Sequence, residues 1–200
     1  TGHRGLIGNF FQKKYKNYKF DKFKGDIENL KDIKKWIKNT KCEEIIHLAA
    51  KVPTHYVKKN YKKSFNVNYK GTINLVKEII LQKKNIKWFF FASTSHVYKF
   101  SNKKLKEDDP LRPSTKYGKT KYLAEEFLNR LKNKGLKICI GRIFTLTHPK
   151  QSTSYAIPAI YKKIKSSKNK DIILNNLNHE RDFCHIEDVC KGINLLLKKR

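Results

Sequence analysis

The sequence predicts an α/β fold with a doubly wound parallel sheet, and three observations support this prediction. Apolar runs alternate with helical patterns along the whole chain. Two of these runs, KWFFFAS (87–93) and LKICIGRIF (136–144), are apolar almost throughout, as expected for strands buried on both faces. Strands that alternate with helices form parallel sheets through right-handed crossovers. Because ligands bind at the carboxyl ends of such strands, the polar residues that follow each run are candidate functional residues.

The elements of the N-terminal part follow from local patterns. YKFDKF (18–23) is expected to form a short strand. EEIIHLAA (43–50) is expected to be a strand that runs into a loop. Between them, NLKDIKKWIKN (29–39) has the pattern of an amphipathic helix, whose apolar face is formed by Leu30, Ile33, Trp36 and Ile37.

Two helices complete the expected order. NYKGTINLVKEIILQ (68–82) precedes the first buried run, and TKYGKTKYLAEEFLNRLKNKG (115–135) precedes the second. The second helix is expected to end at a C-cap glycine, Gly135. We expect one domain over residues 1–145 and a small, incomplete lobe over 146–200 that returns to the core near 181–197.

The composition excludes several classes of protein. The net charge of +29 comes almost entirely from lysine, with only six arginines among 46 basic residues, and the lysines are spread over the whole chain. Base recognition and bidentate binding of phosphate both favour arginine, so nucleic-acid binding is disfavoured. No run approaches the roughly 18 apolar residues of a membrane span. The cysteines and histidines lack metal-ligand spacing, so no metal site is expected, and a cytoplasmic protein is favoured.

A glycine-rich run opens the chain. Gly2, Gly5 and Gly8 have the spacing GxxGxxG ahead of two phenylalanines. Such glycines let the backbone turn and approach a dinucleotide pyrophosphate, which binds at a helix N-terminus, although three glycines also make an ordinary loop. Asp21 lies 19 residues after Gly2, near the position of an acid that binds the adenosine ribose. Arg4 and Lys22 would instead suit a 2′-phosphate, so both NAD and NADP remain open.

A tyrosine and a lysine form the candidate catalytic pair. YGKTK places Tyr117 and Lys121 four residues apart, on one face of the long helix. A nearby ammonium and an oxidised nicotinamide favour the phenolate, so tyrosine can act as a base near neutral pH. The chain holds four Tyr-xxx-Lys pairs where chance gives about two, so the spacing proves nothing by itself. Only the Tyr117 pair opens a long helix after the Pro-containing loop DDPLRPSTK.

The same pair follows a cluster of hydroxyl residues, ASTSHVY, at the end of the first buried run. Thr94 is expected at the carboxyl end of that strand, where it can hydrogen-bond a substrate hydroxyl or carbonyl. Taken alone, Thr94 and Ser95 fit a hydroxyl-capped turn equally well. His96 fits either a substrate contact or an exposed loop residue.

Together these motifs resemble a known family. TGHRGLIG, GDI, HLAA, NYKGT, ASTSHVY, YGKTK and RDFCHIEDV occur in an order and spacing similar to those of the extended short-chain dehydrogenases/reductases. The resemblance is to the branch of NAD-dependent nucleotide-sugar epimerases and dehydratases, and it spans Thr1 to Leu197. It implies a Rossmann-type cofactor domain over 1–145 and a partial substrate-binding lobe over 146–200. It also implies that a first strand precedes Thr1 and a C-terminal region follows Arg200, so that the chain is a fragment.

The resemblance assigns roles by position. Thr94, Tyr117 and Lys121 would form a catalytic triad. The residues expected at the cofactor are Gly2, Arg4, Gly5, Leu6, Ile7, Gly8, Asp21, Asp26, Ile27, Leu48, Ala49, Ala50, Asn68, Tyr117 and Lys121. The residues expected at the substrate are Lys51, Ser95, His96, Thr145 and Arg181.

The implied activity is NAD(P)-dependent oxidoreduction or epimerisation at C4 of a nucleotide-activated sugar, for cell-surface polysaccharides such as lipopolysaccharide. Ser95 and His96 stand where 4,6-dehydratases of the family carry Asp-Glu, which disfavours dehydration. Thr145 and His148 depart from the family pattern FNxxGPxQ, which leaves the sugar open.

Three alternatives remain at this stage. LNNLNHERDF (174–183) is similar to a stretch of GDP-4-keto-6-deoxymannose reductases, so an NADPH-dependent reductase of a nucleotide 4-keto-6-deoxy sugar is the first. A non-catalytic dinucleotide sensor and a basic nucleic-acid-binding module are the others. The resemblance further implies a homodimer, with the Tyr117 helix at the interface and no membrane partner.

Overall fold

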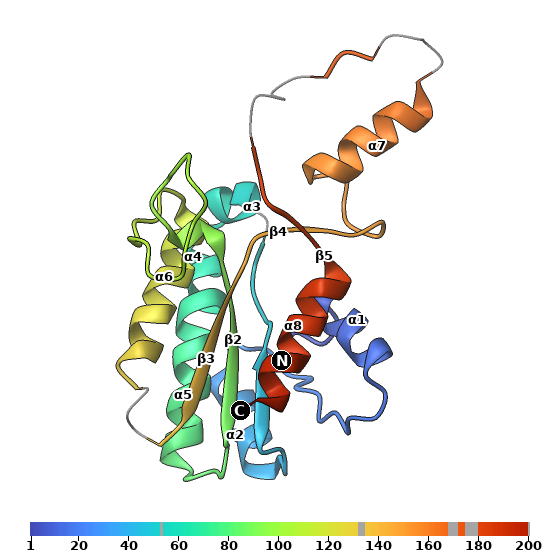
Figure 1. Ribbon diagram of the computed structural model, residues 1–200. Coiled ribbons are helices and arrows are strands. Elements are labelled where there is room, and N and C mark those ends of the chain that lie inside the picture. Colours follow the sequence, from blue (N-terminus) through green and yellow to red (C-terminus); the bar gives the residue numbers. More distant parts are fainter. Residues whose placement is uncertain (53, 132–134, 168–171, 175–179, 200) are drawn as a thin grey trace.

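The computed structural model describes the chain except residues 53, 132–134, 168–171, 175–179 and 200 (Figure 1). The strands are β1 (Glu44–His47), β2 (Trp88–Thr94), β3 (Lys137–Ile143), β4 (Thr145–Thr147) and β5 (Phe183–His185). The α-helices are α1 (Leu6–Lys14), α2 (Leu30–Asn39), α3 (Thr54–Lys59), α4 (Tyr61–Phe65), α5 (Thr72–Leu81), α6 (Lys116–Asn129), α7 (Ala156–Ser166) and α8 (Ile186–Lys198). A π-helix, η1 (Asn66–Gly71), and a 3-10 helix, η2 (Ser95–Val97), complete the described elements.

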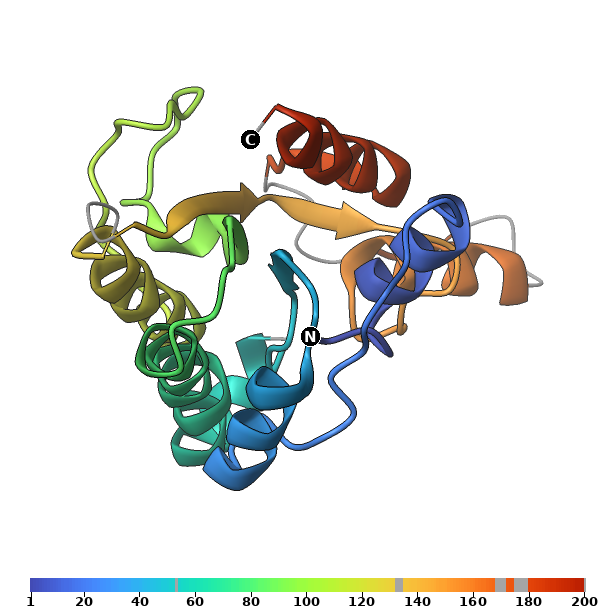
Figure 2. The ribbon, with the colours of Figure 1, turned by 90° about the horizontal axis from the view of Figure 1, so that it is seen from below.

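The main sheet has three strands in the order β1–β2–β3, and both strand pairs are parallel. Phe89 of β2 lies opposite Ile45 of β1 and Ile138 of β3. Strands β4 and β5 form a second parallel pair. Helices α2, α5 and α6 cover one face of the main sheet, whereas α1 and α8 cover the other (Figures 1 and 2). The predicted α/β class with a parallel sheet is confirmed.

The apolar run of β2 explains why helices pack on both faces of the main sheet. Phe89 and Phe91 belong to the core shared with α2, α5 and α6, and Trp88 and Phe90 belong to the core shared with α1 and α8. All four side chains are at most 4% exposed. Because burying one such ring contributes roughly 2–3 kcal/mol, β2 anchors helices on both faces of the sheet.

Helix α2 shows how the amphipathic pattern is used. Asn29 caps the helix, since its side-chain oxygen accepts the N–H of Lys31 at 2.9 Å. Ile33 and Ile37 are fully buried. Leu30, predicted on the same face, is 40% exposed because it is the first residue of α2 and the buried face begins one turn later.

The prediction of a strand over residues 18–23 is wrong. A strand requires hydrogen bonds to a neighbouring strand, and the structure assigns no such pairing to this segment. The segment instead faces β1 across a cavity, to which Tyr18, Phe20 and Asp21 contribute.

The two long helices also differ in extent from the prediction. The helix expected over 68–82 consists of η1 followed by α5. Helix α6 ends at Asn129 rather than at Gly135, which has a φ of +84° but lies six residues further on. Leu128 is the last fully buried residue of α6, so the helix ends where its packing ends. Residues 132–134 of the predicted helix lie outside the described residues.

None of the helices that the structure describes is both long and apolar enough to cross a membrane.

Candidate functional site

The carboxyl end of β2 positions the first candidate catalytic residue. Thr94 is the last residue of the strand and is 5% exposed. Its hydroxyl oxygen accepts the backbone N–H of His96 at 3.3 Å, which starts η2 directly after the strand. The hydroxyl of Thr94 is therefore fixed at the sheet edge where ligands of parallel sheets bind.

The start of α6 approaches this strand end closely. Thr115 caps the helix, since its hydroxyl accepts the N–H of Gly118 at 2.9 Å. A Cβ at Gly118 would overlap the carbonyl oxygen of His96, so only glycine permits this approach. As a result, the Tyr117 phenol lies close enough to the Thr94 hydroxyl for this group to lower its pKa, and the Tyr117 ring lies edge-on to the His96 ring, with 5.8 Å between the ring centres.

Lys121 lies one helical turn after Tyr117 and is buried. It is 1% exposed, and its Nζ lies 4.0 Å from the centre of the Phe91 ring. Burial lowers the pKa of Lys121 to about 7, although the negative charge of Glu125 opposes this shift. The structure therefore brings Thr94, Tyr117 and Lys121 to one place, with a lysine whose charge depends on its neighbours.

The protonation state of Tyr117 is set mainly by burial. Burial raises the pKa of Tyr117 above its usual value, Tyr155 raises it further, and the hydrogen bond to Thr94 lowers it. In the protein alone, Tyr117 is accordingly a neutral phenol at neutral pH. The expected phenolate is thus not a property of the isolated chain, and any lowering of the Tyr117 pKa has to come from bound groups.

Asn68 links the loop after β1 to the catalytic helix. It lies in the π-helix η1 and is fully buried. Its side-chain oxygen accepts the N–H of Lys51 at 2.7 Å, while its amide donates to the Lys51 carbonyl at 3.2 Å and to the Thr120 hydroxyl at 3.1 Å. The Thr120 hydroxyl in turn donates to the Tyr117 carbonyl at 2.8 Å. Asn68 therefore ties residues 48–51 to α6.

The glycine loop lies directly on the end of β1. Gly2 has a φ of +71°, and a Cβ there would lie 2.6 Å from the backbone N of Ala49 and from the carbonyl carbon of Leu48. A Cβ at Gly8 would lie 2.5 Å from the Gly2 carbonyl oxygen. Glycine is thus required at both positions by close backbone contacts.

The loop also leads into a helix N-terminus. Gly5 is the N-cap of α1, which has no side-chain cap. The N–H groups at Leu6 and Ile7 therefore lie in the first turn, the part of a helix that attracts phosphate. Arg4 is exposed beside this turn.

Asp21 and Asp26, expected at the cofactor ribose and adenine, follow the glycine loop in the sequence. One oxygen of Asp21 accepts from the Trp36 indole at 3.2 Å and the other from the Thr40 hydroxyl at 2.5 Å. Asp26 is exposed and accepts the N–H of Glu28, and Ile27 is buried against Gly71. Asp21 therefore already has two hydrogen-bond partners within the protein.

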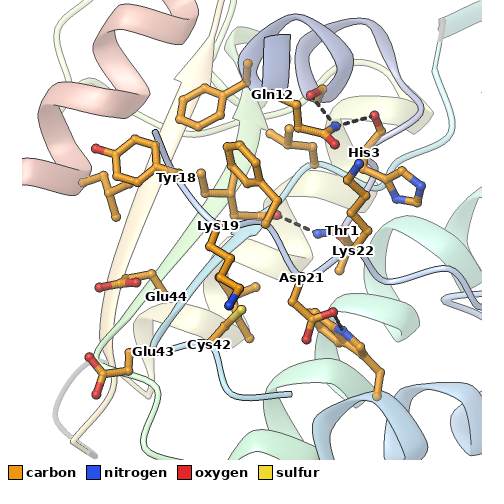
Figure 3. Close-up of a pocket in the computed structure, with 18 of the residues that line it drawn as sticks. Thr1, His3, Gln12, Tyr18, Lys19, Asp21, Lys22, Cys42, Glu43 and Glu44 are labelled. Atoms are coloured by element: carbon orange, nitrogen blue, oxygen red, sulfur yellow. Dashed lines mark hydrogen bonds between the residues drawn. The ribbon is translucent and has the colours of Figure 1, made fainter. Parts of the chain in front are cut away.

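Asp21 also lines a cavity of about 730 Å³ (Figure 3). The cavity separates β1 from residues 18–22, and Thr1, His3 and Gly8 of the glycine loop contribute to it. Thr94, Tyr117 and Lys121 are not among its lining residues. The cavity is thus a gap beside the outer edge of β1 rather than the candidate catalytic site.

The residues expected at the substrate come from both parts of the chain. Ser95 and His96 belong to η2, beside Tyr117. Burial, and then the positive charge of Arg181, lowers the pKa of His96, which places Arg181 on the same side of the site. Thr145 begins β4, with its N–H donating to the Asp182 carbonyl at 3.1 Å. Lys51 is held by Asn68, as described above.

Tyr155 was not predicted as a site residue. It is the N-cap of α7 and affects the pKa of Tyr117 electrostatically, so the lobe after β3 contributes a second phenol to this region. Its sequence context, STSYAIPA, contains no motif that would have identified it.

Comparison with known proteins identifies the family of this sequence. The family model described as GDP-mannose 4,6 dehydratase matches residues 3–200. The chain belongs to this family. Its relatives and structural neighbours include nucleotide-sugar epimerases and dehydratases, so the family resemblance seen in the sequence is confirmed.

Individual relatives of this nucleotide-sugar epimerase/dehydratase family are distant. An uncharacterized UDP-glucose epimerase, YtcB, of Bacillus subtilis is 32% identical over 78% of the chain and 49% of its own length. A UDP-glucuronate 4-epimerase of Thermodesulfobacterium geofontis is 30% identical over 93% of the chain and 57% of its own length. The chain thus spans about half the length of these curated relatives.

Among solved structures, RMD from Pseudomonas aeruginosa complexed with NADPH superposes with a TM-score of 0.88. The match covers 99% of the chain and 70% of that structure, at 19% identity. At this identity the similarity concerns the fold, and it confirms the Rossmann-type sheet of this family member.

Proposed function

We propose that the protein binds NAD or NADP and catalyses oxidoreduction or epimerisation at C4 of a nucleotide-activated sugar, for cell-surface polysaccharide synthesis. The observation that carries the proposal is the site at the end of β2, where the start of α6 brings Tyr117 beside Thr94 and buried Lys121 lies one turn away. Residues 1–145 would hold the cofactor, and residues after β3 would contribute to the substrate side.

The glycine loop fits a dinucleotide. Gly2 and Gly8 lack side chains where a Cβ would meet backbone, and Gly5 leaves the first turn of α1 open. A pyrophosphate needs this combination of a close backbone approach and free N–H groups. Residues 48–50 would line the nicotinamide side of the cleft, since Gly2 packs on Leu48 and Ala49 and Asn68 holds the neighbouring Lys51.

The side chains then have distinct tasks. When bound, the nicotinamide supplies reversible hydride transfer at the sugar carbon. Tyr117 exchanges a proton with the C4 oxygen, and Thr94 hydrogen-bonds the same oxygen. Lys121 stabilises the phenolate by its charge and binds the nicotinamide ribose. Burial raises the pKa of Tyr117. Deprotonation of Tyr117 therefore depends on positive charge from Lys121 and the oxidised nicotinamide ring.

One observation favours a reductase as the second candidate. Tyr117 is a neutral phenol in the protein alone, which is the form that donates a proton to a 4-keto oxygen. The sequence similarity to reductases at 174–183 adds little here, because residues 175–179 lie outside the described residues. Dehydration is disfavoured, since Ser95 and His96 follow Thr94 in place of an acid–base pair.

The test combines cofactor binding with turnover. NADH and NADPH are titrated by fluorescence, and UDP-glucose, UDP-glucuronate and a GDP-4-keto-6-deoxy sugar are offered as substrates. Tyr117→Phe is expected to bind cofactor normally but to lose roughly 10²–10⁴-fold in turnover, as for removal of a general acid–base. Tyr161→Phe is the matched control, because Tyr161 and Lys165 have the same spacing but Tyr161 is 64% exposed.

The outcomes separate the alternatives. Epimerised product would support the first candidate, and NADPH consumption with the keto sugar would support the reductase. Cofactor binding without turnover would indicate a dinucleotide sensor. Salt-sensitive nucleic-acid binding without cofactor binding would indicate a basic binding module. Near-normal turnover by Tyr117→Phe would overturn the catalytic assignment.

A further inference from the structure

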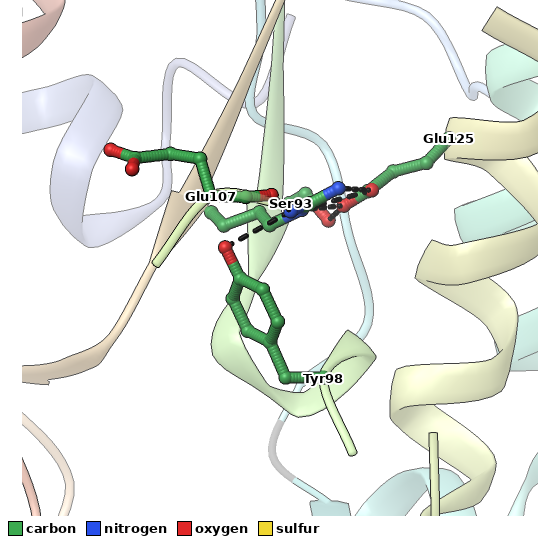
Figure 4. A network of polar contacts seen from close by, with 5 residues as sticks. Ser93, Tyr98, Glu107 and Glu125 are labelled. Atoms are coloured by element: carbon green, nitrogen blue, oxygen red, sulfur yellow. Dashed lines mark hydrogen bonds and ion pairs between the residues drawn. The ribbon is translucent and has the colours of Figure 1, made fainter. Parts of the chain in front are cut away.

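A buried ion pair links the strand end to the catalytic helix (Figure 4). Glu125 of α6 is fully buried, and Arg142 of β3 donates to its carboxylate from Nε at 3.1 Å and from the terminal nitrogen at 2.9 Å. The Ser93 hydroxyl donates to the other carboxylate oxygen. Both oxygens of Glu125 are thus occupied, as a buried carboxylate requires.

Arg142 extends the network to the loop between Thr94 and Tyr117. Its second terminal nitrogen donates to the Tyr98 hydroxyl at 3.0 Å and to the Glu107 carbonyl at 2.8 Å. The guanidinium also lies 4.8 Å from the centre of the Tyr98 ring. One arginine of β3 therefore holds α6 and the intervening loop together.

The network of Glu125, Arg142 and Ser93 lies next to the candidate triad, on the same helix and the same strand. Tyr117, Lys121 and Glu125 follow one another at intervals of four residues, so they share one face of α6. Ser93 directly precedes Thr94 in β2 and lies opposite Arg142 in the sheet register. A shift at Glu125 would accordingly move the helix that carries Tyr117 relative to the strand that carries Thr94.

We propose that Glu125, held by Arg142 and Ser93, is a positioning residue that fixes α6 against β2 and whose charge favours the ammonium form of Lys121. This inference rests on the proposed function of the triad. The charged and titratable groups near Lys121 are Tyr117 and Glu125 on its own helix and His47 on β1, and the Glu125 carboxylate is itself paired with Arg142 of β3. His47 is buried, which lowers its pKa well below the usual value and keeps it neutral, so Glu125 is the negative charge that acts on Lys121.

The first measurement needs no substrate. The side-chain ammonium of Lys121 is identified by lysine-selective NMR as the resonance lost in Lys121→Arg, and its titration is followed with pH. Glu125→Gln keeps the shape and removes the charge, so the Lys121 midpoint is expected to fall by about one pH unit. Glu126→Gln, the matched control, removes the same charge from the next residue of α6 and is expected to leave the midpoint unchanged.

The second measurement concerns catalysis. Glu125→Gln is expected to lower kcat about 10- to 100-fold, because small displacements at a site have such effects, while KM and cofactor affinity stay near wild type. The alkaline limb of the plot of kcat against pH should move to lower pH together with the titration midpoint of Lys121. A purely structural role would lower the melting temperature without moving this limb.

A second variant covers the case in which Glu125→Gln leaves Arg142 unpaired and does not fold. Glu125→Gln combined with Arg142→Gln keeps two groups that can hydrogen-bond each other and leaves no unpaired charge. Loss of kcat with a lowered Lys121 midpoint in either variant supports the proposal. An unchanged midpoint and kcat in a folded variant overturns it. If Glu125→Gln shifts the Lys121 midpoint but the wild type turns over none of the substrates, the proposed function fails while the charge relationship stands.

Discussion

The two halves of the candidate site are built in different ways. Around Thr94, Tyr117 and Lys121, polar side chains join separate elements, as Glu125 and Arg142 show. Around the glycine loop, the packing of the loop on the end of β1 depends on backbone contacts that only glycine allows, as at Gly2. That second region borders a cavity of about 730 Å³ beside β1. The comparison indicates that the catalytic side is specified by side-chain chemistry and the cofactor side by backbone shape.

The largest expected difference between the two regions concerns packing. Phe89→Ala removes a fully buried ring from the core under α5 and α6, which should lower the free energy of unfolding by about 3–5 kcal/mol. Phe20→Ala removes the same atoms from a half-buried ring that lines the cavity and contacts Phe11, and should cost at most about 2 kcal/mol. Urea unfolding at pH 7 measures both values. Equal losses would show that the glycine-loop side is packed as tightly as the core.

The contrast between the packed core and the segment beside the cavity also explains which strands the sequence could predict. The run WFFFAST predicted a central strand because burial on both faces leaves a continuous apolar signal. Residues 18–23 instead mix aromatic and charged residues, and the expected strand did not form because a strand depends on a neighbour and a cavity lies between this segment and β1. The candidate catalytic pair was recognisable from its context, because only Tyr117 and Lys121 open a long helix after the loop DDPLRPSTK and follow the hydroxyl cluster ASTSHVY.

The Glu125–Arg142 pair was missed because its partners lie 17 residues apart, in different elements. Two weak signals were nevertheless present in the sequence. An arginine lies inside the apolar run ICIGRI of β3, and a glutamate lies among the buried positions of α6, next to Ala124. The buried carboxylate of Glu125 requires a partner such as Arg142, since an unpaired buried charge is strongly destabilising. Tyr155 had no such signal.

The next largest effect compares two glycines. Gly2→Ala places a side chain at a φ of +71° and 2.6 Å from the Ala49 nitrogen. We expect a loss of about 1–3 kcal/mol in unfolding free energy and at least about tenfold weaker NADH binding. Gly192→Ala, in α8 with no atom within 4 Å of the added Cβ, should stabilise the protein by about 0.5–1 kcal/mol. Unchanged NADH affinity in Gly2→Ala would contradict the role of the loop in cofactor binding.

His47 is the side chain that joins the two regions. The Thr72 hydroxyl donates to the Asn68 carbonyl at 2.9 Å, so Nε2 of His47 has to donate to Thr72, at 2.9 Å. Nδ1 is then the acceptor for the Thr1 hydroxyl, at 2.6 Å. Thus the neutral tautomer of His47 connects the start of the glycine loop to the π-helix that carries Asn68, and a second proton on Nδ1 would place a buried positive charge there and reverse the hydrogen bond to Thr1.

This arrangement predicts the smallest effect, a dependence of stability on pH. Burial, followed by the charges of the N-terminus and Lys121, lowers the pKa of His47 well below 6.5 in the folded state. The unfolded chain therefore binds a proton that the folded chain does not, so stability decreases as pH falls below about 6.5, by at most about 1.4 kcal/mol per pH unit. Urea unfolding at pH 7.5, 6.5 and 5.5 should show a flatter dependence for His47→Gln than for wild type. His55→Gln, at an exposed position of α3, should keep the wild-type slope, and an identical slope in all three proteins would mean that His47 does not couple the two regions to pH.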